Sequence, residues 1–157
     1  MVRSRKEQPS RTGPRLTERA LVRDAGQVIF DRADEYVCSE ALNKRLVSEH
    51  VLSAQVYGNY GIYRVRLETG PRGKLTPFCT CPAEMFFCKH AVALGRTWIE
   101  APESFFDLKT LDTRLEGYSK ADFISLIRQM AESCPVVLGV LGIEGFEEEE
   151  EDEFDEW

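Results

Sequence analysis

The positions of apolar residues predict helices toward both ends of the chain and strands between them. Between residues 16 and 42 they recur at threes and fours, the spacing of one helix face. The recurring positions are Leu21, Val22, Ala25, Val28, Ile29, Ala33, Tyr36 and Val37. Gly26 predicts a division into a short first helix and a main helix near residues 27–39. Cys38 lies beside this stripe, and we interpret it as a small buried hydrophobic residue.

From Lys44 onward the residues are typical of β-strands. Val65 and Leu67 alternate with Arg64 and Arg66, which predicts a strand with one buried face. Turn residues at 58–59 and 70–73 separate the apolar runs, and a further strand is expected at residues 74–79. The pattern therefore predicts a small antiparallel meander of three or four strands.

Helical spacing returns after residue 90. Ala91, Leu94 and Trp98 form an apolar stripe that Pro102 closes. A second helix is expected after Ser119, which has an acidic residue three positions later as its capping partner. The pair Cys134-Pro135 ends this helix, and Pro135 is expected to be the first residue of another short one.

The run from Val136 to Ile143 is apolar almost throughout. We expect it to be buried against the preceding helix, with an exposed docking surface as the alternative. Together the elements predict an α+β fold, with an N-terminal helix, a meander and C-terminal helices.

Charge divides the chain into a basic start, a nearly balanced body and an acidic end. The net charge is -7, yet residues 144–157 hold ten acidic groups, so residues 1–143 carry +3. We expect residues 1–15 to be a disordered arm, either simply solvated or in contact with phosphates or an acidic partner. The acidic tail is either a solubilising segment or a docking motif anchored by Phe154 and Trp157.

The composition also limits the cellular setting. No apolar run reaches about 18 residues, and no signal-peptide core follows the basic start, so we expect no membrane association. A reducing compartment is expected, cytoplasmic or, in a eukaryote, nuclear. There the five cysteines favour metal binding over disulfides.

One short segment carries the strongest chemical signal. It reads Cys79-Thr80-Cys81-Pro82, and then Cys88-Lys89-His90 after a gap of six residues. Three thiolates and one imidazole are a common ligand set for a structural zinc ion. Cys88 and His90 are two residues apart and cannot share one helix face, so they are expected at a helix N-terminus. His50 is expected at the surface, because four ligands are already present.

This segment, preceded by a meander and followed by an Ala/Val/Leu helix, resembles the SWIM-type zinc finger. The resemblance covers about residues 27–100. It implies a strand–strand–helix finger in which Cys79, Cys81, Cys88 and His90 bind one zinc ion. It also implies a binding module that contacts DNA or proteins and occurs alongside Swi/Snf-type helicase-like ATPases. The chain itself has no phosphate-binding Gly-x-x-x-x-Gly-Lys loop, so any such ATPase would be a separate protein.

Three classes of function follow from these observations. The first is a zinc-binding interaction module whose basic strands contact nucleic acid or a partner; the candidate contacts are Arg64, Arg66, Arg72, Lys74 and Lys89, with Tyr57, Tyr60 and Tyr63 beside them. The second is a protein-binding adaptor that docks through its acidic tail. The third, a zinc hydrolase with Glu84 as base, is disfavoured because four protein ligands leave no position for water. A thiol redox switch is a lesser alternative that nothing in the sequence selects over a structural site. No small-molecule substrate is expected.

The predicted organisation has four parts. They are a basic arm at residues 1–15, a zinc-binding domain at 16–100, a helical extension at 101–143 and an acidic tail at 144–157.

Overall fold

The computed structural model describes residues 13–146. The chain divides into two compact units, one ending at Asp112 and the other starting at Thr113. The first twelve residues of the basic arm and the tail residues Phe154 and Trp157 lie outside the described residues.

The first unit is built on one five-stranded sheet. Its strands are β1 (Leu42–Ser48), β2 (Val51–Gly58), β3 (Gly61–Thr69), β4 (Leu75–Cys79) and β5 (Phe106–Asp107), in the order β4-β3-β2-β1-β5. Strands β1 to β4 are antiparallel neighbours, whereas β5 pairs with β1 in parallel. The predicted α+β class and meander are confirmed. The two-residue β5 was not predicted.

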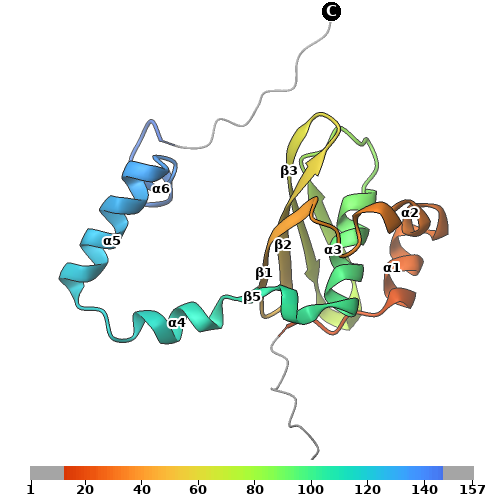
Figure 1. Cartoon of the computed structure of the whole chain (residues 1–157), viewed down its shortest axis with the longest axis horizontal. Coiled ribbons are helices and arrows are strands. Elements are labelled where there is room, and N and C mark those ends of the chain that lie inside the picture. Colours follow the sequence, from red (N-terminus) through yellow and green to blue (C-terminus); the bar gives the residue numbers. More distant parts are fainter. Residues whose placement is uncertain (1–12, 147–157) are drawn as a thin grey trace, which may run out of the picture. The chain divides into compact units, whose positions relative to one another are not determined.

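Helices cover one face of this sheet (Figure 1). They are α1 (Glu18–Ala25), α2 (Gln27–Arg32), the 3-10 turn η1 (Asp34–Tyr36) and α3 (Lys89–Glu100). The sheet turns Leu52, Val65 and Leu67 toward them, and all three are buried, as are Ala91 and Leu94 of α3. Burial of these aliphatic side chains is the main stabilising contribution to this unit. The alternation read from Val65 and Leu67 is therefore confirmed.

The N-terminal helices differ from the expected pattern. Gly26 does divide them, but the main helix predicted near 27–39 is wrong, since α2 ends at Arg32 and η1 follows. The Arg96 guanidinium of α3 donates to the Phe30 carbonyl oxygen at 3.1 Å and also pairs with Asp34. These long-range contacts hold the irregular end of α2.

Cys38 is exposed, so its interpretation as a buried hydrophobic residue is wrong. Its backbone has a positive φ of 52°, and its N–H donates to the Thr97 hydroxyl at 3.0 Å. The chain turns here to enter β1, which directs the thiol away from the apolar stripe.

The turns are confirmed where glycine marked them, at 58–61 and, through the 3-10 turn η2 (Pro71–Gly73), at 70–74. A further turn between β1 and β2 was missed. It consists of Glu49 and His50, and Glu49 adopts a positive φ of 40° without being glycine or asparagine. His50 is exposed there, as predicted.

The ordered first unit extends beyond residues 16–100 at both ends. Pro14 is buried, and its carbonyl accepts a hydrogen bond from the Trp98 indole N–H at 3.0 Å. After α3 the chain forms the 3-10 turn η3 (Pro102–Ser104), and Phe105 packs against Trp98 before β5 joins the sheet. Helix α4 (Lys109–Leu115) crosses the boundary between the two units.

The second unit contains α5 (Lys120–Ser133) and the short α6 (Val137–Val140). Ser119 and Asp122 form the predicted capping box. Pro135 is not the first residue of α6, because the helix starts two residues later. The burial predicted for residues 136–143 is also wrong: Val140 is 84% exposed and Leu141 and Ile143 are about half exposed. The described part of this unit has too few elements to enclose that run.

Within the described residues, no helix is both long and apolar enough to cross a membrane.

Gly95 lets α3 approach its neighbours closely. A Cβ atom at this position would lie 2.9 Å from the methyl groups of Leu16, Leu21 and Leu67. We expect Gly95→Val to lower the free energy of unfolding by about 1–3 kcal/mol, because the larger side chain would displace these leucine methyl groups. Urea unfolding followed by Trp98 fluorescence measures this loss. Gly70→Ala is the control, since its nearest atom is 3.5 Å away; equal stability of both variants would contradict the prediction.

Candidate metal centre

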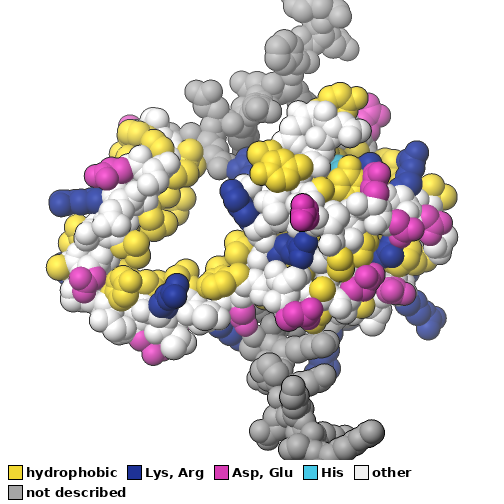
Figure 2. Space-filling model, viewed as in Figure 1, with side chains coloured by type: hydrophobic (Ala, Val, Ile, Leu, Met, Phe, Trp, Pro, Cys, Tyr) yellow, Lys and Arg dark blue, Asp and Glu magenta, His cyan; other side chains and the backbone are white. Residues whose placement is uncertain are grey.

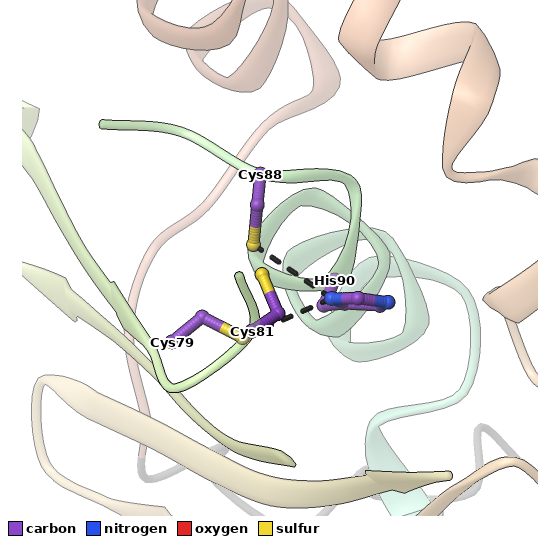
Figure 3. Close-up of side chains that lie close together, drawn as sticks. All are labelled: Cys79, Cys81, Cys88 and His90. Atoms are coloured by element: carbon purple, nitrogen blue, oxygen red, sulfur yellow. Dashed lines mark hydrogen bonds between the residues drawn. The ribbon is translucent and has the colours of Figure 1, made fainter. Parts of the chain in front are cut away.

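Four potential ligands converge where β4 meets α3. Cys79 is the last residue of β4, and Cys81 follows two positions later in the loop. Cys88 is the N-cap of α3, and His90 lies in the first turn of that helix. Figure 3 shows the three sulfurs and the imidazole turned toward one point. Their ligand atoms all lie within 4.8 Å of one another.

The arrangement fits a tetrahedral zinc ion. The His90 Nδ1 atom lies 3.8 Å from the Cys79 sulfur and 4.0 Å from the Cys88 sulfur. Zinc bonds of about 2.3 Å to sulfur and about 2.0 Å to nitrogen place the two atoms about 3.5 Å apart in a tetrahedron. Nδ1 is therefore the atom of His90 that is placed to bind the ion. The four side chains would fill all four positions of a tetrahedral ion, as in a closed structural site.

The local environment favours deprotonated sulfur. Hydrogen bonds from Cys79, from His90 and from the Ala91 N–H at the start of α3 lower the pKa of Cys88 to about 4. The pKa of Cys79 is raised, because it shares a hydrogen bond with Cys88 and is partly desolvated. A bound zinc ion holds all three sulfurs as thiolates.

Residues 63–94 match the SWIM zinc finger family. By this match, the segment is similar to a SWIM zinc finger, and we refer to it below as the SWIM finger. It starts in β3 and ends in α3, so it includes all four ligands and confirms the resemblance seen in the sequence. The match covers about a fifth of the chain. No curated protein and no solved structure matches the chain.

Two tyrosines enclose the histidine of the SWIM finger. The ring of Tyr36 meets His90 in a T-shaped contact at 4.8 Å between ring centroids, and Tyr63 packs on it at 5.2 Å. His90 is only 5% exposed, and its Nε2 atom is buried without a hydrogen-bond partner among the described residues. This role of Tyr36 was not predicted, and Tyr63 was expected beside the basic residues of an exposed face. Tyr63 has the same strand parity as Val65 and Leu67, which is the signal that it points inward.

The five basic residues predicted as contacts do not form one cluster. Arg64 and Arg66 are exposed on the sheet face opposite the helices, and Arg66 pairs with Glu68 at 3.0 Å. Arg72 and Lys74 line a shallow depression beside the end of α1. Lys89 pairs with Glu35 at 2.5 Å and lies over the ring of Tyr36. Their role as contacts stays a prediction.

The remaining cysteines stand apart from the SWIM finger. Cys38 and Cys134 are exposed, and neither belongs to the ligand cluster found among residues 13–146. They supply matched controls for the ligands.

We expect Cys79→Ser and Cys88→Ser to lose the single bound zinc ion and to unfold at least residues 75–95. Zinc binding in small peptides contributes about 10–16 kcal/mol to folding, and a hydroxyl is a poor zinc ligand. Zinc content after gel filtration and amide exchange of this segment measure both effects. Cys38→Ser should keep its zinc. A ligand variant that retains one zinc ion and normal protection would contradict the assignment.

Proposed function

We propose that the chain is an interaction module whose zinc is structural and whose role is to bind a protein partner. The closed set of four protein ligands is the observation that carries this proposal. Glu84, the candidate base of a zinc hydrolase, is exposed in the loop between the ligand pairs and has no open coordination position to act on. The metal's role would thus be to hold β4 and α3 together and to fix the surfaces beside them.

Charge favours a protein over nucleic acid as the main partner. Residues 13–112 contain thirteen basic and thirteen acidic side chains. Figure 2 shows both signs interspersed over the visible face of the first unit. Strong autonomous binding to phosphates needs a basic surface. The SWIM resemblance makes a separate helicase-like ATPase the first partner to test, with the acidic tail as an additional docking element.

Nucleic acid is the second candidate, and the sheet face opposite α1 to α3 in the first unit favours it. The strand register aligns Phe78, Arg66, Ser53, Leu46 and Phe106 in one row across the five strands. Phe78 is 56% exposed and Phe106 45%, although a solvated sheet face is usually polar. Aromatic rings beside arginines are the chemistry that binds single strands.

Two measurements separate these candidates. We expect zinc-loaded full-length protein to capture a specific protein from native lysate, and the metal-free protein to lose it. Repeating the capture with residues 1–143 tests the tail. In gel shifts at low salt, we expect little binding to duplex or single strands.

A strong single-strand shift that falls at least tenfold in Arg64→Gln/Arg66→Gln, but not in the exposed control Arg128→Gln, would establish nucleic acid instead. Absence of both capture and shift would contradict an interaction module of either kind.

A further inference from the structure

A groove of about 650 Å³ opens beside the metal centre within the first unit. Its walls come from three separate segments: the end of α2 with η1, the turn between β2 and β3, and the loop from Cys81 to Cys88. Ala83 and Met85, which lie in this loop between two of the metal ligands, line the groove. The volume suits one or two side chains of a bound peptide.

The base and rim of the groove are apolar and aromatic. Tyr36, Tyr63 and His90 line it and are buried, so its base is fixed by packing. Tyr60 and Met85 stand at the rim and are 84% and 50% exposed. An exposed tyrosine and an exposed methionine over a rigid aromatic base offer adaptable contact area to an apolar side chain.

One wall of the groove is acidic toward solvent. Asp34 pairs with Arg96, and Glu35 pairs with Lys89. The two carboxylates are 70% and 61% exposed, whereas the side chains of Arg96 and Lys89 are only 14% and 31% exposed. A ligand that approaches this wall therefore meets the carboxylates first.

Asp31 adds a third carboxylate, and Arg32 adds one positive charge to the same wall. The groove already contains one cation, the Lys89 ammonium, between a carboxylate and an aromatic ring. The Lys89 ammonium lies 4.7 Å from the centroid of the Tyr36 ring and 2.5 Å from a Glu35 oxygen. Carboxylate and aromatic face together are an environment that binds lysine and arginine.

We propose that this groove binds a peptide segment of the partner in which an apolar side chain stands next to a lysine or arginine. The apolar side chain packs between Tyr60 and Met85, and the cation meets the carboxylates of Asp31 and Glu35. This inference rests on the proposed function, because it names the surface and the chemistry through which a protein partner is held. Nucleic acid does not suit the groove, since its phosphates would face these carboxylates.

The test uses zinc-loaded full-length protein and fluorescein-labelled nonapeptides in a glycine–serine background. Four peptides carry a central leucine–arginine, leucine–lysine, phenylalanine–arginine or phenylalanine–lysine pair. Matched peptides replace the basic residue with glutamate or the apolar residue with alanine. We expect saturable anisotropy changes with the apolar–basic peptides and at least tenfold weaker binding of both matched sets.

Three substitutions should weaken the binding fivefold or more: Tyr60→Ala, Asp31→Asn and Glu35→Gln. Tyr60→Ala leaves the fold intact, because the Tyr63 hydroxyl accepts from the backbone N–H of residue 60 and the replaced side chain is exposed. Glu49→Gln, in the exposed turn between β1 and β2, is the control and should bind normally. Zinc content confirms that each variant is folded.

The inference is overturned if no apolar–basic peptide saturates, if the glutamate peptides bind equally, or if the three groove variants bind like Glu49→Gln. Lysate capture separates this failure from that of the proposed function. A partner that wild type and Tyr60→Ala/Glu35→Gln capture equally leaves the interaction module standing and removes the groove. Failure of the wild type to capture any protein contradicts the proposed function itself.

Discussion

A tetrahedral zinc ion needs four ligand atoms at one point, and here they come from the end of a strand and the start of a helix. The loop between Cys81 and Cys88 has little regular structure of its own. Phe87 anchors it in the hydrophobic core, and the metal would join its two ends. Because a structural zinc contributes about as much free energy as the whole stability of a small domain, the position of α3 on the sheet depends on this site.

The same constraint extends to the groove that we propose as a binding surface. Helix α3 carries Arg96, which holds the end of α2, and Lys89, which holds Glu35. Tyr36 and Tyr63 pack on His90 from two other elements. The acidic wall and the aromatic base of the groove are thus both tied to the ligand-bearing helix. The affinity of a partner for this groove would therefore depend on whether zinc is bound.

The features that depend on neighbouring residues in the sequence were predicted correctly. Alternation around Val65 and Leu67 identified the buried sheet face, and Ala91, Leu94 and Trp98 identified the packed side of α3. The ligand set followed from residue type and spacing alone. What failed depends on contacts distant in sequence: Arg96 ends the α2 segment, and β5 exists because Phe105 returns to Trp98. The Glu49-His50 turn was missed because Glu49 has a backbone conformation that glutamate rarely adopts.

Strand β4 bears on how the protein avoids unwanted assembly. It is an edge strand of the sheet. The backbone hydrogen bonds of Lys74 and Thr80, at its two ends, show that the N–H and C=O groups of even-numbered residues point toward β3. The odd-numbered N–H groups therefore point outward. That of Leu75 is taken by the Asp24 carboxylate at 3.3 Å, and Pro77 has none to offer. Two of the three outward N–H positions of β4 are thus closed to pairing with another chain, and the opposite edge strand is only two residues long.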